Sequence, residues 1–181
     1  MEAYHHMGVH MKTLEPILPA RGCWKEPYDP EFSCMHLPLK GSMKKEILAA
    51  GNAETPFPVF PGLAIENCVE WSIYLGYPNF LLFNAPDRVY WYRILPTGPT
   101  TSTLMTTMIV SKAARELPDF EAILKKEVQA GIDFHLEDME VCTATQRGMQ
   151  SVGYAQGRLS HLEETIWQFQ KYLGEVIRRS A

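Results

Sequence analysis

The sequence lacks several features that would assign it to a class at once. None of its apolar runs approaches the roughly 18 residues of a membrane-spanning helix, and its first residues show neither the basic nor the apolar stretch of a secretory signal. Lys and Arg number 17 against 21 Asp and Glu, a formal net charge of −4. Proteins that bind nucleic acid usually carry a basic face. The sequence therefore predicts neither a nucleic-acid partner nor a membrane partner.

Cysteine is also scarce. The four cysteines are widely separated and form no C-x-x-C pair: Cys23, Cys34, Cys68 and Cys142. Without a secretory signal, such cysteines are expected to be reduced thiols of a cytoplasmic protein. What the chain does have is length and apolar content, with 181 residues of which 46% are hydrophobic. That is enough for a single domain, residues 1–181, with its own core.

Proline and glycine divide the chain into regions. Eight of the 13 prolines lie at or before Pro61, and residues 14–38 show no sustained period, which predicts an irregular functional loop or linker. A short helix is expected over residues 44–50. The middle of the chain reads as four strands, over residues 71–75, 80–83, 88–95 and 102–110. Their short connections favour antiparallel neighbours.

The last third of the chain is predicted to be helical. One helix is expected from Asp119 to about residue 130, where Gly131 interrupts it, and a second from about residue 132 to 149. A third helix begins with a capping box of Ser160 and Glu163. Its apolar positions recur at helical spacing, which predicts packing on the sheet: Leu162, Ile166, Phe169, Leu173 and Val176. The expected fold is α+β, with an antiparallel sheet covered by a long C-terminal helix.

The first ten residues concentrate metal-ligating side chains, with His5, His6 and His10 following Glu2. Neutral imidazole is the commonest metal ligand near neutral pH. Histidine-rich N-termini also occur as tags or solvated ends. Spacing leaves the pair open, because His6 and His10 would share one helical face, whereas His5 and His10 would need a bend to converge.

A facial iron site needs one carboxylate beside two histidines. Asp138 is the candidate, because its neighbours at helical spacing are mostly apolar, and a carboxylate among apolar groups should be paired, protonated or metal-bound. These neighbours are Phe134, Val141, Cys142 and Thr145. Glu137 falls on a polar face and is expected to be solvated. The alternative for Asp138 is a capping or ion-paired aspartate in a helix that starts later.

Other polar residues have plainer interpretations. His135 and His161 lie near predicted helix ends, where surface or capping roles are expected. Cys142 is expected to be a small core residue in preference to a pocket residue. The run Tyr90–Tyr92 is expected in the sheet core, with a substrate wall as the second interpretation.

Several motifs together resemble the catalytic domain of the α subunit of Rieske-type non-haem iron oxygenases. Residues 2–10, EAYHHMGVH, resemble the family's E/D-x-x-H-x-x-x-x-H segment. Glu137-Asp138 followed by residues 146–151, QRGMQS, resembles its ED…Q-x-G-x-x-S helix. Residues 157–160 with Glu163, and the strand entry at residues 77–79, also match. The pieces run in family order from residue 2 to about residue 170.

This resemblance implies a helix-grip fold of the START/SRPBCC type, a curved antiparallel sheet wrapped on a long helix. It implies Fe(II) held by His5, His10 and Asp138, with Glu2 linking a ligand histidine to the incoming electrons. The implied activity is O2-dependent hydroxylation, dihydroxylation or demethylation of a small organic substrate, aromatic or quaternary ammonium. The implied partners are a Rieske domain with a ferredoxin or reductase, and two further copies of the chain in a homotrimer.

One departure from the family concerns the [2Fe–2S] cluster, which a Rieske domain holds through C-x-H and C-x-x-H motifs. The chain contains Cys34-Met35-His36 once and no C-x-x-H. We interpret Cys34 and His36 as a chance match in a loop. The cluster is therefore expected on a missing or separate domain. Residues 1–181 are expected to form the catalytic domain, shortened at its N-terminus.

Two other functions fit the same residues. Helix-grip domains also enclose apolar pockets, so a non-catalytic module that binds a hydrophobic small molecule is the main alternative. On that interpretation the histidines are incidental. A hydrolase with zinc on the same ligands is the third.

Overall fold

The computed structural model describes residues 8–14, 22–39 and 55–180. Glu2, His5, His6 and the predicted helix over residues 44–50 lie outside the described residues. Six strands form a single sheet: β1 (Trp24–Lys25), β2 (Phe32–Pro38), β3 (Glu70–Gly76), β4 (Phe80–Asn84), β5 (Arg88–Gly98) and β6 (Thr101–Val110). The described helices are α2 (Met11–Leu14), α4 (Phe120–Met149) and α5 (Glu164–Ser180), with short 3-10 turns at Ile65–Val69, Lys112–Glu116 and His161–Glu163.

The strands lie in the sheet in the order of the sequence, β1 to β6, and every neighbouring pair is antiparallel. This confirms the four predicted strands and the antiparallel topology that their short connections required. The strand predicted over residues 88–95 ends too early. β5 continues through an irregularity between Pro96 and Gly98, and Gly98 pairs with Thr101.

The prediction of an irregular segment over residues 14–38 is wrong for its second half, because β1 and β2 lie there. β2 has a pairing partner on each side, with Trp24 opposite His36 and Phe32 opposite Gly76. A strand paired on both sides is fixed by its neighbours, so its own sequence needs no clean alternation. Cys34 and His36 therefore lie on a strand inside the sheet, and not in a loop.

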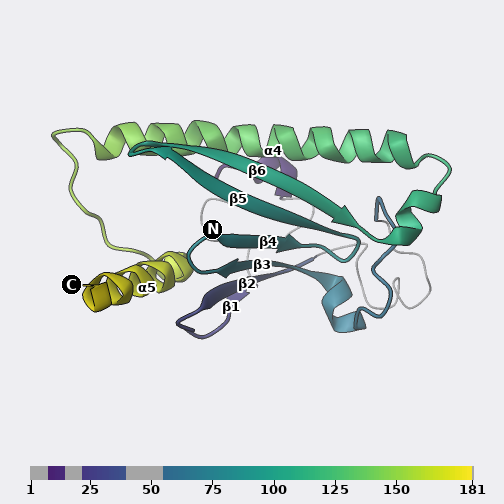
Figure 1. Ribbon diagram of the computed structural model, residues 1–181, viewed down its shortest axis with the longest axis horizontal. Helices are drawn as coiled ribbons and strands as arrows, with labels where there is room; N and C mark the ends of the chain where they lie inside the picture. The colour runs from purple at the N-terminus through teal and green to yellow at the C-terminus, as the bar shows by residue number, and fades with distance from the viewer. Residues whose placement is uncertain (1–7, 15–21, 40–54, 181) are drawn as a thin grey trace.

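The predicted break at Gly131 is also wrong, since α4 is one continuous helix of 30 residues. A glycine inside a helix costs only about 1 kcal/mol relative to alanine, which tertiary packing can offset. Here the position lies against the sheet, where a Cβ built at Gly131 would sit 3.8 Å from the Cε1 atom of Tyr90. Figure 1 shows α4 running along the β5 and β6 side of the sheet.

α4 and β5 follow each other in register. Arg88 contacts Glu127, Tyr90 lies beside Gly131, and the ring of Tyr92 contacts His135. Two residues of a strand rise about 6.6–6.8 Å, and four residues of a helix rise about 6 Å. One helical turn therefore stays opposite each alternate residue of β5, all on one face of the strand.

α5 begins at the predicted capping box, in which the Ser160 side chain accepts a hydrogen bond from Leu162 and the Glu163 side chain accepts one from the Ser160 N–H. The predicted packing face is wrong in part. Thr165 and Gln168 are the buried residues of α5, and three of the five predicted apolar positions are exposed: Leu162, Leu173 and Val176.

Polar contacts account for the difference between the buried face of α5 and the predicted one. The Gln168 amide donates to the carbonyl of Glu26, and Lys25 pairs with Glu164 at 2.7 Å. These contacts tie the start of α5 to β1 and leave part of its apolar stripe facing outward. Phe169 still packs on Tyr77, with ring centroids 5.7 Å apart.

The described core lies between the middle strands and the segment that carries α2. It consists of Leu14, Met35, Leu37 and Ile73, with partly buried Leu81, Phe83 and Phe134 packed against it. Because Phe134 belongs to α4, the long helix closes this core. The architecture confirms the α+β class and is consistent with a helix-grip domain.

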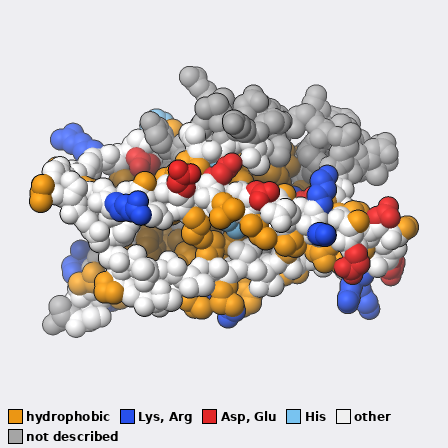
Figure 2. All heavy atoms as spheres, turned by 90° about the horizontal axis from the view of Figure 1, so that it is seen from above, with side chains coloured by type: hydrophobic (Ala, Val, Ile, Leu, Met, Phe, Trp, Pro, Cys, Tyr) orange, Lys and Arg blue, Asp and Glu red, His pale blue; other side chains and the backbone are white. Residues whose placement is uncertain are grey.

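The outer surfaces retain many apolar groups. Val128, Ile132, Leu136 and Met139 share one flank of α4 and are exposed, and Figure 2 shows hydrophobic side chains on the face that carries this helix. Among the described helices, none has the length and apolar content to cross a membrane.

Candidate metal centre

The candidate site begins with His10, which stands at the start of α2. The carbonyl of His10 accepts hydrogen bonds from the backbone N–H groups of Thr13 and Leu14, at 3.1 and 2.8 Å. These bonds close the short turn of α2 and fix the backbone at His10. The side chain is completely buried, and its ring stacks on Phe134 with centroids 3.8 Å apart and an interplanar angle of 16°. His10 is therefore held rigidly against α4.

Each ring nitrogen of His10 faces a different carboxylate of α4. Nδ1 lies 2.8 Å from Oε2 of Glu137, and Nε2 lies 2.8 Å from Oδ1 of Asp138. When Nδ1 donates its proton to Glu137, a neutral imidazole presents the lone pair of Nε2 toward the Asp138 side. A carboxylate on the far nitrogen is the usual partner of a histidine that binds a metal through its other nitrogen.

The separation of Nε2 and Oδ1 also fits a shared metal ion. A histidine nitrogen or a carboxylate oxygen lies about 2.0–2.2 Å from the transition-metal ion that it binds. Two such ligand atoms at right angles about the ion are then about 3 Å from each other. The observed 2.8 Å is close to this spacing. Histidine and carboxylate are also the donor types of a facial iron site. The residues present therefore fit the metal that the sequence predicts.

Asp138 lies in the middle of α4, and this helix fixes its position. Because the helix begins at Phe120, Asp138 does not cap a later-starting helix, and this half of the alternative is wrong. The ion-paired half agrees with its contact with His10. The Asp138 side chain is 32% exposed, so it is only partly removed from water. Its carboxylate projects toward the ring of His10 from the same turn that supplies Phe134.

Glu137 contradicts its predicted role as a solvated residue of a polar face. Its side chain is 42% exposed, yet Oε2 contacts His10. Glu137 does lie on a polar face of α4, but the segment with His10 and α2 packs against the helix at this position. Sequence reasoning missed the contact because helical periodicity cannot show a segment that arrives from 127 residues away.

His135 differs from its prediction as well. It lies inside α4, its side chain is only 18% exposed, and Nδ1 is 3.7 Å from Oδ2 of Asp138. The ring meets Tyr92 of β5 edge-on, with centroids 5.2 Å apart. The spacing of three residues before Asp138 was the one sequence signal of this contact.

Tyr90 and Tyr92 both point toward α4, whereas Trp91 points to the opposite face of the sheet. Burial raises the pKa of the Tyr92 phenol, and the nearby Tyr90 and the charge of Asp138 raise it further. Tyr92 therefore stays protonated and neutral at neutral pH. The predicted place of these aromatic residues in the sheet is correct, and Tyr92 also borders the candidate site.

Of the predicted ligand set, the structure brings together His10 and Asp138. His5 and Glu2 lie outside the described residues. Within residues 8–14, 22–39 and 55–180, no three histidine, cysteine or carboxylate side chains converge as a metal site. A complete facial set therefore requires a further ligand, and His5 stays the predicted one.

A buried charge network lies along α4 from the candidate site. Asp87 is 1% exposed, receives the backbone N–H of Phe57 at 3.1 Å, and accepts two bonds from Arg88 at 2.8 and 3.0 Å. Arg88 also reaches Glu127 at 3.4 Å. Burial opposes the charge of Arg88, but the neighbouring carboxylates outweigh it, and its pKa is raised. This network joins β5 to α4 and was not foreseen from the sequence.

The predictions for Cys142 and Cys34 are both wrong. Cys142 is exposed, and not a core residue. Cys34 is buried beside His36, whose ring stacks on Trp24 and whose Nδ1 lies 2.7 Å from Glu70. Burial raises the pKa of the Cys34 thiol to about 11, with further contributions from the charges of Glu26 and Glu70. Cys34 is therefore an unreactive thiol of the sheet.

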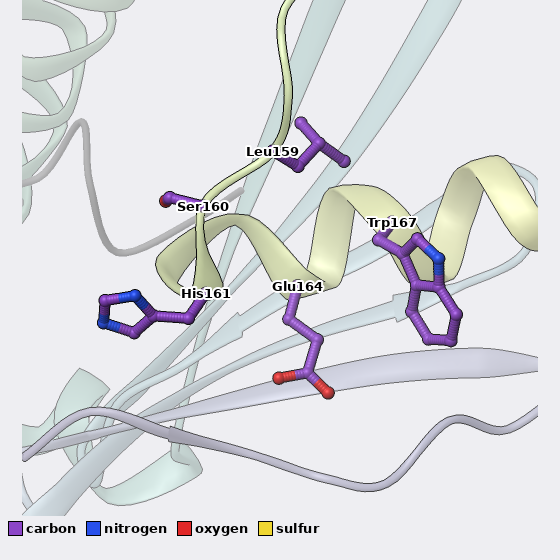
Figure 3. A pocket seen from close by; sticks show the side chains of 5 residues that line it. All are labelled: Leu159, Ser160, His161, Glu164 and Trp167. Carbon is purple, nitrogen blue, oxygen red and sulfur yellow. The ribbon is translucent and has the colours of Figure 1, made fainter.

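A shallow surface pocket occurs at the start of α5, far along the chain from His10. It is lined by Leu159, Ser160, His161, Glu164 and Trp167, and Figure 3 shows these side chains around the first turn of the helix. Glu164 is already paired with Lys25. His161 is exposed here, as predicted for a residue at a helix end. The pocket contains none of the predicted ligands.

Comparison with known proteins places the chain in a family. Residues 1–179 match the family described as the ring hydroxylating alpha subunit (catalytic domain). The match covers almost the whole chain, and the chain belongs to this family of oxidoreductase domains.

Two curated relatives are similar over about half of the chain. The chloroplastic choline monooxygenase of Arabidopsis thaliana is 27% identical over 93 residues, which are 51% of this chain and 21% of the relative. The chloroplastic choline monooxygenase of Atriplex hortensis is 24% identical over 104 residues, 57% of this chain and 23% of the relative. The matched segment is thus less than a quarter of either relative's length.

Proposed function

We propose that this chain is the catalytic portion of the terminal oxygenase in a Rieske-type non-haem iron system. The proposed reaction is O2-dependent hydroxylation, dihydroxylation or demethylation of a small organic substrate. One observation carries the proposal: a fully buried histidine, His10, lies between two carboxylates of the long helix. Burying a polar side chain costs free energy, and side chains that are buried in spite of this cost are typical of functional sites.

The proposed ligands of Fe(II) are His5, His10 and Asp138. When bound, the iron would supply the activation of O2, with electrons from a [2Fe–2S] cluster outside this chain. The chain's own residues prepare the site. Glu137 holds the proton on Nδ1 of His10, so that the lone pair of Nε2 is directed toward Asp138 and the proposed metal. Phe134 fixes the ring plane, which leaves the imidazole little orientational freedom to lose on binding.

The proposed substrate class draws support from the names of the relatives and of the family. Both carry the name choline monooxygenase, which supports a quaternary ammonium substrate, and the family description supports an aromatic one. Tyr92 supplies an aromatic surface beside Asp138. Aromatic rings attract both kinds of substrate, by stacking or by cation–π contact.

The partners and setting are proposals of the same kind. A Rieske domain with a ferredoxin or reductase would donate electrons, with Glu2 near the entry path, and three copies of the chain would assemble. A cytoplasmic location is proposed from the reduced cysteines, whereas the curated relatives are named as chloroplastic. Sedimentation of the purified chain measures the assembly directly.

The test of the proposed function is iron binding under anaerobic conditions. The purified chain is reconstituted with Fe(II), desalted and analysed for metal, alongside His10→Ala and Asp138→Asn. Asp133→Asn is the matched control, because Asp133 is exposed on the same helix and contacts Gln129. The expected result is about one iron per chain in the wild type and the control, and little in the two site variants.

The opposite result identifies the alternatives. Equal iron in wild type, His10→Ala and Asp138→Asn would discard the oxygenase proposal and favour the non-catalytic module for a hydrophobic ligand. Retention of zinc with O2-independent hydrolysis would favour the hydrolase. Circular dichroism of each variant shows whether the loss of iron is accompanied by a loss of fold.

A further inference from the structure

The carboxylate of Asp138 is shared between two histidines. Oδ1 lies 2.8 Å from Nε2 of His10, and Oδ2 lies 3.7 Å from Nδ1 of His135. The two oxygens therefore face different rings, one from α2 and one from the preceding turn of α4. The sequence prediction assigned no role at the site to His135.

His135 is held in place from two sides. Its ring packs edge-to-face with Tyr92, with ring centroids 5.2 Å apart and an interplanar angle of 75°. It packs in the same way with Phe134, with centroids 5.7 Å apart and an angle of 72°. Phe134 in turn stacks face-on with His10. The three rings His10, Phe134 and His135 thus form one packed group beside Asp138, supported by Tyr92 from β5.

We propose that His135 is a positioning residue for the Asp138 carboxylate. It attracts Oδ2, so that Oδ1 alone is presented toward His10 and the metal. This inference rests on the proposed function, because it requires a metal at Asp138. Among the predicted ligands that the structure describes, His135 is seen against the carboxylate of Asp138, so we expect it to act through that residue.

The physical reason is that a carboxylate can bind a metal with one oxygen or with both. A donor held on one oxygen favours binding through the other, and such supporting contacts typically change metal affinity 10–100-fold. The present 3.7 Å is longer than a hydrogen bond. Closing this distance would take a rotation of the Asp138 side chain toward His135, which lies three residues earlier on the same helix.

The test compares two variants at this position. His135→Phe keeps a ring against Tyr92 but removes the donor, whereas His135→Gln keeps a donor. Fe(II) affinity is measured by anaerobic titration, and the visible spectrum of the Co(II)-loaded chain reports coordination number. We expect His135→Phe to bind Fe(II) about 10–100-fold more weakly with an altered Co(II) spectrum, and His135→Gln to remain near wild type in both.

A second variant tests the same contact from the sheet. Tyr92→Leu leaves His135 in place and removes the ring beside it, so we expect a smaller loss of affinity and a partial spectral change. His161→Phe, at the exposed histidine of the 3-10 turn before α5, is the matched control and should change neither. Thermal unfolding of each metal-free chain shows that it is folded.

The outcomes separate the two claims. If the wild type binds Fe(II) and both His135→Phe and Tyr92→Leu match it in affinity and spectrum, the positioning role is overturned and the proposed function stands. If the wild type binds neither Fe(II) nor Co(II), both fall together. A loss in His135→Phe that His135→Gln does not share supports the role, because a purely structural contribution would not move the Co(II) spectrum in this way.

Discussion

His10 and Asp138 are 128 residues apart in the chain, and their side-chain atoms Nε2 and Oδ1 are 2.8 Å apart. The first stands at the start of a four-residue helix and the second in the middle of a 30-residue helix. Their meeting brings the N-terminal segment against α4. Any ion bound between them would therefore link the N-terminal segment to the helical last third.

Metal binding of this kind should raise stability. A ligand that binds only the folded chain stabilises it by about 2.7 kcal/mol when its concentration is 100 times its Kd. Since the ligands would come from both ends of the chain, Fe(II) should protect α2 as well as α4. The protection of the backbone amides of Thr13 and Leu14 from hydrogen exchange is the local measure of that link.

Replacing Glu137 with glutamine should weaken metal binding. The variant keeps a side chain of the same shape but loses the charge that holds the proton on Nδ1 of His10. Partners of this type contribute about 10–100-fold to metal affinity, and a loss in that range is expected in an anaerobic Fe(II) titration. Glu140→Gln, exposed on the same helix, is the control. Unchanged affinity in Glu137→Gln would show that the carboxylate is a solvated neighbour only.

Replacing Asp87 with alanine should destabilise the chain strongly. The guanidinium of Arg88 would lose both of its short bonds to a carboxylate and keep the longer contact with Glu127, at 3.4 Å, and its contact with the ring of Tyr90. Removing one partner of a buried pair costs about 3–5 kcal/mol. Urea unfolding measures the free energy of unfolding, with Asp133→Ala on the surface of α4 as the control. A loss below about 1 kcal/mol would mean that the network contributes little to joining β5 and α4.

Replacing Gly131 with alanine should stabilise the chain. The helix is continuous through this position, and the added Cβ would lie at an ordinary contact distance from Tyr90, 3.8 Å. The gain expected from helix propensity is up to about 1 kcal/mol in the free energy of unfolding. Gly148→Ala, with open space around its Cβ, gives the propensity effect without the neighbour. A Gly131→Ala chain less stable than wild type would show that α4 lies closer to the sheet than these distances allow.

The cysteines should differ sharply in alkylation. Because the pKa of Cys34 is raised to about 11, its thiol is protonated at pH 8, and reactivity should appear only as the pH rises toward that value. Cys142 is exposed and accessible. Iodoacetamide at pH 8 should therefore modify Cys142 first, as mapped by mass spectrometry. In Cys142→Ser this rapid labelling should disappear, and rapid labelling of Cys34 at pH 8 would contradict its burial in the sheet.

The sequence predicted the elements whose signals are local. Four strands and the cap of α5 follow from turn residues, aromatic and β-branched runs, and the Ser160–Glu163 pair, all read within a few residues. β2 was missed because its alternation is obscured by burial on both faces. The break at Gly131 was wrong because propensity is a weak constraint that packing against Tyr90 overrides.

The site divides in the same way. Residue type and spacing made Asp138 a candidate, since a carboxylate among apolar neighbours needs a partner, and the family resemblance implied that His10 would join it. Glu137 and His135 were misjudged, because their partners arrive from α2 and from a carboxylate whose orientation no periodicity encodes. The family motifs supplied the pairing of the two ends of the chain, which spacing alone had left open.

By itself, the sequence determined the class of fold, the antiparallel pairing of its last four strands and the residue types available for a metal, because these follow from local periodicity, turn chemistry and charge. Only the tertiary structure decided which carboxylates His10 would meet, which face of α5 would be buried, and that β5 and α4 would run in register. These outcomes depend on contacts between segments far apart in the chain. Such contacts are selected by packing and burial of the whole molecule, and no short window of residues contains them.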